Sequence, residues 1–382
     1  AVFITYFLYL LIIRFSSESR VKDIVTCFQI FMSVIFMLSF QVLPRVINLS
    51  QLSTHFELQW YAYLLPPVWM ALAVDALATT NFDMLHTAMI ALACIVPILT
   101  FWFMNKYLAP SFAKKLEAMS NTATEKNEGG ITNAQKEKNQ LSVIFARISC
   151  TSPVEKSGFE ITWKITGRDK SFKLQFYPGV AYIAVFIFIF VFKSGSNITA
   201  VWKDLPLSNS FLWFFYVPMM TVSSSLMIVA FNENYPAAWV YHSMPVGKPG
   251  MLVSGTVKSL FIKFFMPVYV CITGFCVYIW GFPVLDDALF ALCNNLFCFL
   301  IFANVSDHYL PFSSQPNTQQ QTGKFLKALL QFIIVAITVG LHYLVIYLQL
   351  SWLLWVLTPL LILACFLLIK RLQNLNWNQI AI

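Results

Sequence analysis

The chain has 382 residues, of which 58% are hydrophobic, 16% aromatic and only 11% charged. Soluble globular domains carry about 25% charged residues, so this composition excludes an ordinary soluble fold. The mean hydropathy is +0.69, and the longest apolar runs reach the ~20 residues that cross a bilayer as a helix. Because apolar residues run continuously and do not alternate with polar ones, helices are favoured over barrel strands. We therefore predict an all-α polytopic membrane protein.

Nine apolar runs are predicted to lie in the membrane. In chain order they are 1–13, 24–43, 84–104, 177–192, 211–230, 259–280, 284–303, 327–347 and 352–369. The first run is apolar from its first residue, is too short to span, and has neither the basic start nor the cleavage site of a signal peptide. We expect it to belong to a helix of a longer protein.

The basic residues predict the orientation of these spans, because Lys and Arg accumulate in short cytoplasmic loops. They gather in the loop 14–23, in the segment 105–176, which holds twelve of them, and at Lys370 and Arg371 in the tail. With these three regions inside, only three of the 25 basic residues fall outside. The net charge of +8 is then largely a consequence of topology, and we expect no nucleic-acid partner.

A tenth apolar run, 60–80, is predicted to be a re-entrant or interfacial element on the outer face. If it spanned the membrane together with 84–104, the basic segment 105–176 would lie outside. Two adjacent prolines near its start break a helix, and it also contains an acidic residue. We expect an outer gate formed by Pro66, Pro67, Trp69 and Asp75.

The segment 105–176 is predicted to divide into two parts. Residues 120–140 are polar and lack aromatic side chains, which is typical of a linker. Residues 155–176 mix basic residues with aromatic ones, which favours a membrane-surface helix whose rings face the lipid. These rings belong to Phe159, Trp163, Phe172 and Phe176.

The order of the spans predicts a repeat. Six spans follow the linker, and the three before it run in the same directions as the last three of such a six-span unit. We therefore predict that 1–104 is the C-terminal part of a first six-span half, that 105–176 is a cytoplasmic linker and membrane-surface segment, and that 177–382 is a second six-span half.

The stretch "FNENYPAAWVYHSMPVGKPG", residues 231–250, interrupts the apolar sequence on the predicted cytoplasmic side. Asn234 can cap a helix and Pro236 suits its first turn, while Pro245 would end it. The connection 231–258 is longer than a plain turn requires. We therefore predict a short transverse helix at the membrane surface, with Trp239, Tyr241 and His242 forming a docking surface.

The run "AAWVYHSMPVGKPGMLVSGTVKSL" resembles the coupling segment of type-2 ABC exporter permeases. In that family a Trp-containing helix precedes a Pro-containing turn between the second and third spans. The positions that match are Trp239, Met244-Pro245-Val246, Gly255 and Lys258. One departure is the outer loop between the last two spans, which is too short for the re-entrant helix expected there.

The resemblance implies a six-helix permease bundle preceded by the last three spans of a similar bundle, as in a large fused bacterial subgroup. It implies an inner-membrane protein with a cytoplasmic C-terminus, a lipophilic or amphipathic substrate, a separate ABC ATPase subunit and a possible homodimer. The motif G-x-x-x-x-G-K-[ST] is absent from the sequence, so ATP hydrolysis is expected in the partner. The residues expected to contact the ATPase are Glu233, Tyr235, Trp239, Tyr241, His242 and Pro245.

Two other classes of protein remain as alternatives. An ion-coupled secondary transporter places ionisable residues within its spans, and here they are scarce. A membrane-embedded enzyme needs a nucleophile and base in a cavity, whereas His86 and His342 are interpreted as isolated residues. The eight Cys form no C-x-x-C pair, so they are interpreted as packing residues, and no cofactor or metal is expected.

Overall fold

The structure is a computed structural model that describes residues 21–46, 66–79, 83–103, 105–106, 133–191, 205–315 and 321–381. The chain divides into two compact units. The first comprises Ala1–Met32 and Leu43–Gly130, and the second comprises Ser33–Val42 and Ile131–Ile382. The predicted apolar run 1–13 and most of the predicted linker 120–140 lie outside the described residues.

The N-terminal part of the chain holds three described helices, which are α2 (Val21–Val46), α3 (Pro66–Thr79) and α4 (Met84–Phe103). The prolines at 66 and 67 are the first two residues of α3, where a missing amide proton costs no helical hydrogen bond. With 14 residues, α3 is about 21 Å long, shorter than the ~30 Å hydrocarbon layer. It packs against α4.

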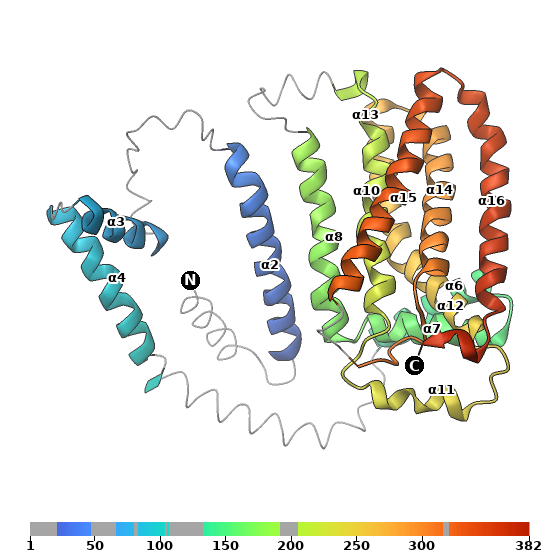
Figure 1. Ribbon diagram of the computed structural model, residues 1–382, viewed down its shortest axis with the longest axis horizontal. Coiled ribbons are helices and arrows are strands. Elements are labelled where there is room, and N and C mark those ends of the chain that lie inside the picture. The colour runs from blue at the N-terminus through green and yellow to red at the C-terminus, as the bar shows by residue number, and fades with distance from the viewer. Residues whose placement is uncertain are drawn as a thin grey trace. The chain divides into compact units, whose positions relative to one another are not determined.

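The second unit is a bundle of helices connected by short elements, with α7 lying across one end (Figure 1). The long helices are α6 (Asn133–Ser149), α7 (Pro153–Thr166), α8 (Lys170–Val191), α10 (Phe211–Ile228), α12 (Gly250–Leu260), α13 (Met266–Trp280), α14 (Val284–Val305), α15 (Gln321–Tyr347) and α16 (Ser351–Gln373). The short elements are η5 (Leu205–Leu207), η6 (Tyr235–Ala238), α11 (Trp239–Ser243), the π-helical turn η7 (Phe261–Phe265), η8 (Trp377–Gln379), and the strands β1 (His308–Tyr309) and β2 (Ile380–Ala381).

Six described helices are long and apolar enough to cross a membrane. They are Met84–Phe103, Phe211–Ile228, Gly250–Trp280, Val284–Val305, Leu326–Tyr347 and Ser351–Gln373. Each coincides with a predicted span, and α2 and α8 cover two further predicted runs. Among the described residues, the extended structure is limited to the two-residue parallel pair of β1 and β2 and one isolated bridge. The chain is therefore an all-helical integral membrane protein.

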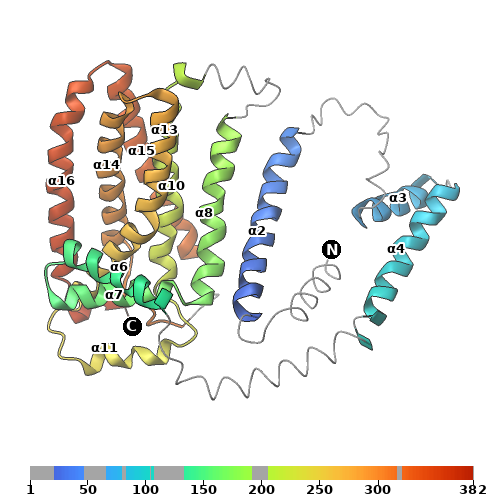
Figure 2. The same cartoon turned by 180° about the vertical axis from the view of Figure 1, so that it is seen from behind.

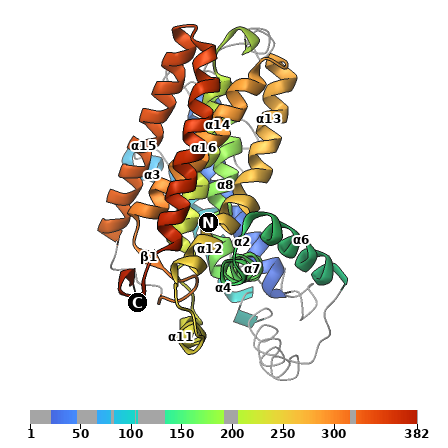
Figure 3. The ribbon, with the colours of Figure 1, turned by 90° about the vertical axis from the view of Figure 1, so that its right-hand side faces the viewer.

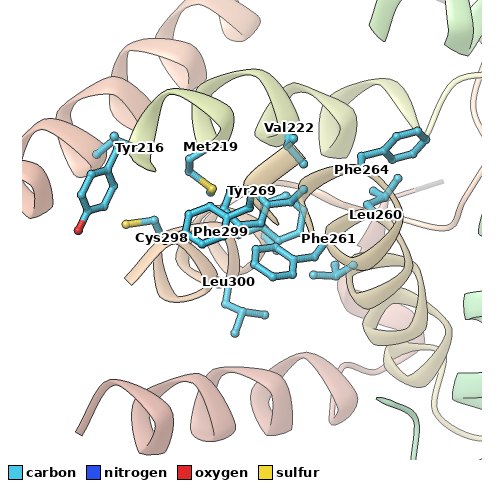
Figure 4. Packing of buried hydrophobic residues seen from close by; sticks show 14 of the residues in the cluster. Tyr216, Met219, Val222, Leu260, Phe261, Phe264, Tyr269, Cys298, Phe299 and Leu300 are labelled. Carbon is cyan, nitrogen blue, oxygen red and sulfur yellow. The ribbon is translucent and has the colours of Figure 1, made fainter. Parts of the chain in front are cut away.

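Aromatic side chains fill the interior of the second unit, where α10, η7, α13 and α14 meet (Figure 4). The Phe261 and Phe265 rings stack with centroids 4.5 Å apart, and Phe265 stacks on Tyr269 at 5.1 Å. Phe299 of α14 is fully buried against them and lies 5.5 Å from Phe261. Since lipid is as apolar as these side chains, close packing rather than exclusion from water holds the helices together.

The helix α7 lies across the ends of the long helices (Figures 1 and 2). The rings of Phe159, Phe172 and Phe176 were expected to face the lipid, but each is at most 1% exposed and packs inside the protein. Trp163 stacks between Phe145 and Phe159, 5.7 Å from each. Phe159 turns inward because α7 packs against α12. Phe172 and Phe176 lie in the first turns of α8, and their rings pack against Phe264 at 5.5 and 4.5 Å.

Candidate functional site

The helical stretch Tyr235–Ser243, formed by η6 and α11 and here named the transverse segment, connects α10 to α12. It lies at the same end of the second unit as α7 and the C-terminus (Figure 3). The short helix expected between Asn234 and Pro245 is therefore present. Asn234 itself makes no capping bond, and the side chain of Asn232 instead accepts a hydrogen bond from the Asn234 amide at 2.7 Å.

The transverse segment has an exposed face and a buried anchor. Trp239 is 66% exposed and Tyr235 is 37% exposed. Tyr241 was expected on the docking surface, but it is only 8% exposed and its hydroxyl donates to the Pro311 carbonyl at 3.2 Å. Burial raises the pKa of Tyr241 to about 12. The prediction for Tyr241 was wrong because residues close together in a helix point in different directions, and Tyr241 points into the protein while Trp239 points outward.

The remaining predicted coupling residues lie on the surface around the helix. Glu233 precedes it and Pro245 follows its last turn, and both are exposed. His242 is exposed too, and its ring lies 5.2 Å from the ring of Trp377 in the C-terminal tail. Five of the six predicted residues are thus accessible to a partner, while Tyr241 is not.

The C-terminal tail fastens the end of the transverse segment to α16. The indole of Trp377 donates to the Val246 carbonyl at 3.0 Å, and the Lys248 ammonium donates to the Asn374 side chain at 3.1 Å. Gly250 lies so close to the last turn of α16 that an added Cβ would be 2.2 Å from the Leu372 carbonyl oxygen. The connection from the transverse segment to α12 is therefore bonded to the C-terminal end of α16 and the tail that follows it.

A buried carboxylate, that of Glu155, joins α7 to α12 and α16. It is fully buried and lies 2.7 Å from the Lys258 ammonium. Ser254 of α12 donates to it at 2.7 Å, Gln373 of α16 at 3.0 Å and the Thr151 amide at 2.8 Å. These contacts, here named the Glu155 joint, connect three helices through one ion.

The hydrogen bonds of the Glu155 joint keep the carboxylate ionised. Burial alone would raise the pKa of Glu155, but the bonds from Lys258, Ser254, Thr151 and Gln373 more than offset it, so the pKa is lowered to about 2. A buried charge with this many partners is a well-satisfied one. The joint therefore acts as a fixed connection at neutral pH.

Two glycines let α7 and α12 approach within backbone contact. A Cβ on Gly255 would be 2.2 Å from the Glu155 carbonyl oxygen, and one on Gly158 would be 2.6 Å from the Leu252 carbonyl oxygen. Gly255 and Lys258 are two of the positions that carry the family resemblance. Both contact Glu155 of α7 and do not form part of the surface of the transverse segment.

Sequence reasoning missed Glu155 as a site residue. A signal was present in "SPVE", residues 152–155, where a Ser three residues before a Glu marks a helix start. The Ser152 hydroxyl accepts the Glu155 amide at 3.1 Å, and the Glu155 carboxylate reaches back to Thr151. Its pairing with Lys258, 103 positions further along, has no such local signal.

A cleft of about 560 Å³ separates α7 from the transverse segment. Its walls are mainly apolar, and Arg168 and Lys170 lie at its edge. Asp169 also lines it, but the carboxylate of Asp169 accepts the amides of Ser171 and Phe172 at the start of α8. The exposed charge that the cleft offers is therefore basic.

A second polar cluster lies within the bundle and corrects the interpretation of His342 as isolated. Its Nδ1 is 3.0 Å from the Tyr216 hydroxyl, and its Nε2 is 3.3 Å from the Asp287 carboxylate. The amide of Asn294 donates to the same hydroxyl at 2.9 Å. His342 is 0% exposed, so α10, α14 and α15 share a hydrogen-bonded chain. Nothing local in the sequence relates these positions.

The predicted outer-gate residues all lie in α3. Pro66 and Pro67 begin the helix, and Trp69 is half-buried. Asp75 is exposed, and its carboxylate is 3.5 Å from Nε2 of His86 in α4. His86 therefore has a partner as well, and this contact holds α3 and α4 together within the first unit.

The described residues contain no group of three or more His, Cys, Asp or Glu side chains that could hold a metal ion. The helices and these contacts define a helical integral membrane protein with a surface segment braced against its bundle. No family model, curated protein or solved structure matches the chain.

Proposed function

We propose that the chain is the membrane permease of an ATP-driven exporter, and that a separate ABC ATPase subunit docks on the transverse segment. The observation that carries this proposal is the exposure of Trp239 on a helix that is otherwise held firmly. A large aromatic side chain that is 66% exposed in the polar end of a membrane protein is typical of an interaction site. The resemblance at Trp239, Met244-Pro245-Val246, Gly255 and Lys258 supports the same function.

The contacts around the transverse segment suit it to transmit force. Tyr241 ties it to Pro311 beyond α14, Trp377 ties it to the tail of α16, and Lys248 leads directly into α12. The Glu155 joint then connects α12 to α7 and α16. A displacement imposed at Trp239 would therefore be transmitted to several spans at once, because each connection is made by hydrogen bonds or an ion pair.

The proposal extends to the setting and cargo of the protein. We propose a bacterial inner membrane, a cytoplasmic C-terminus, and a lipophilic or amphipathic substrate. The scarcity of charged side chains in the spans favours such a substrate over a strongly charged one. A homodimer or a fused pair of halves would supply a second bundle, and α3 would act as an outer gate through Pro66, Pro67, Trp69 and Asp75.

Substitution of Trp239 by Ala tests the proposal. A Trp at the centre of an interface commonly contributes about 2 kcal/mol or more, which is roughly thirtyfold in affinity. Trp239→Ala should therefore reduce co-purification of the ATPase and ATP-dependent transport while membrane insertion stays normal. Trp352→Ala is the matched control, because Trp352 is 63% exposed at the other end of α16. Transport that survives both Trp239→Ala and ATP depletion would refute the proposal.

A second candidate function, an ion-coupled secondary transporter, is favoured by the chain from Asp287 through His342 and Tyr216 to Asn294. Ionisable groups bonded to one another inside a bundle are typical of proton relays. This candidate predicts that transport continues without ATP, stops on addition of an uncoupler, and is lost in Asp287→Asn. If the chain is instead an ATP-driven permease, transport should stop when ATP is depleted.

A further inference from the structure

A polar cleft lies where α16 ends and the C-terminal tail begins. Its volume is about 530 Å³, and it is lined by His308, Arg371, Asn374, Leu375 and Gln379. Four of these five residues carry side chains that can donate hydrogen bonds.

Among the residues that the structure describes, the amide oxygens of this cleft accept hydrogen bonds from the protein, whereas its amide NH₂ groups donate none. The Asn374 oxygen accepts from the Lys248 ammonium at 3.1 Å, and the Gln379 oxygen accepts from the Asn376 amide at 3.1 Å. Each amide therefore turns its NH₂ group to other partners. The Arg371 guanidinium, which has only donors, has no hydrogen-bond or ion-pair partner among the residues that the structure describes.

The charge of the cleft is positive. No carboxylate lines it, and the nearby Asp307 carboxylate is paired with the Lys327 ammonium. Burial, with a smaller contribution from Arg371, lowers the pKa of His308, although Asp307 acts in the opposite direction. Arg371 therefore supplies the fixed charge for an anion.

The position of Arg371 on α16 indicates which anion reaches it. Leu363, Leu367 and Arg371 are spaced four residues apart, so they share one face of the helix. Leu363 is 56% exposed and Leu367 is 59% exposed, as expected for side chains in contact with lipid tails. An acyl chain that runs along this face brings its phosphate to the level of Arg371.

We propose that this cleft binds the phosphate group of an anionic phospholipid, held by the Arg371 guanidinium and the NH₂ groups of Asn374 and Gln379. An Arg fork matches two phosphate oxygens at once, and basic pockets between spans are suited to lipid head groups. The bound lipid would brace the tail that fastens the transverse segment, through Asn374 and Lys248. The proposal rests on the cleft alone and does not depend on transport being driven by ATP.

Lipid binding by the purified full chain tests this site. Native mass spectrometry in detergent would count phosphatidylglycerol and phosphatidylcholine molecules bound as each lipid is added. Phosphatidylglycerol should bind more tightly, and Arg371→Gln should weaken it about tenfold, the loss expected for charged hydrogen bonds. Lys370→Gln is the matched control, since Lys370 has the same charge but lies over the Phe366 ring, 4.6 Å from its centroid. It should change binding less than twofold.

A second variant keeps the test valid if Arg371→Gln does not fold. Gln379→Glu retains the oxygen that accepts the Asn376 amide but replaces the free donor by a negative charge, so phosphatidylglycerol binding should fall while the fold is kept. Equal losses in Arg371→Gln and Lys370→Gln would overturn the proposal in favour of general surface charge. Full displacement of the lipid by millimolar inorganic phosphate would overturn it in favour of a soluble anion. Equal binding of both lipids would also refute it.

Discussion

Removal of the ammonium from the Glu155 joint should strongly destabilise the protein. In Lys258→Met the carboxylate of Glu155 stays fully buried and keeps the neutral donors of Thr151, Ser254 and Gln373, but it loses its counter-ion. Loss of one partner of a buried ion pair typically costs 3–5 kcal/mol, because the remaining charge has no compensation. The remaining donors reduce this penalty, so we expect about 3 kcal/mol at pH 7.

The lowered pKa of Glu155 makes the stability depend on pH. Its pKa is lowered from 4.5 to about 2, and each pKa unit corresponds to about 1.4 kcal/mol. The ionised form in the folded state is thus favoured by roughly 3 kcal/mol. Since the folded pKa is below the unfolded one, this stability is present above pH 4.5 and is lost as the pH falls from 4.5 towards 2.

Guanidinium-induced unfolding in detergent micelles, followed by Trp fluorescence, measures both effects. Lys258→Met should be less stable than the wild type by about 3 kcal/mol at pH 7.5. Glu155→Gln should remove most of the pH dependence between 4.5 and 2, relative to the wild type. The double variant should be more stable than Lys258→Met alone, because its remaining amide is neutral.

Three outcomes would refute this reasoning. The first is a cost below 1 kcal/mol for Lys258→Met, which would mean that water or a rearranged neighbour replaces the ammonium. The second is an unchanged pH profile in Glu155→Gln. The third is a double variant, Glu155→Gln with Lys258→Met, that is less stable than both single variants. The losses of stability from the two substitutions would then be independent, and Glu155 and Lys258 would not be coupled.

Three further predictions follow from other contacts. Gly255→Ala should lower stability or separate α7 from α12, because the added Cβ would be 2.2 Å from a carbonyl oxygen. In the control Gly274→Ala the Cβ meets nothing within 4 Å, and the variant should gain up to ~1 kcal/mol from helix propensity. Thermal unfolding compares the two variants, and equal effects would contradict the close contact at Gly255. Burial raises the pKa of Cys150 to about 11, so iodoacetamide should modify this thiol slowly at pH 8 in folded protein and rapidly after denaturation. Mass spectrometry of the peptide that contains Cys150 measures both rates, and rapid modification of the folded protein would contradict the burial. Tyr241→Phe leaves the Pro311 carbonyl without its 3.2 Å partner and should cost about 1 kcal/mol; an unchanged unfolding midpoint would show that water replaces the hydroxyl.

The spans could be predicted from sequence because their signal is local. A run of apolar residues identifies a membrane helix without any knowledge of its neighbours, and all six candidate spans fall on predicted runs. The start of α3 at Pro66 and the end of α11 before Pro245 are also local, since proline restricts its own backbone and that of the preceding residue.

The polar contacts could not be predicted in the same way, because their partners are distant in sequence. Glu155 and Lys258 come from α7 and α12, and Asp287, His342 and Tyr216 come from three helices. Each residue taken alone resembles a solvated charge or an interfacial His. The burial of Tyr241 was missed for a related reason, since which side of a short helix faces the protein depends on the element beneath it.

The uninterrupted run from α12 through η7 to α13 has a mechanical consequence. With 31 residues, Gly250–Trp280, this rod is about 46 Å long, so roughly 16 Å of it extends beyond a ~30 Å hydrocarbon layer. The helix α7 packs against α12, the N-terminal part of this rod. A tilt of α12 would be carried along the helix towards α13. The π-helical turn at Phe261–Phe265, where the backbone hydrogen bonds change their spacing, is the pivot at which this rod can bend.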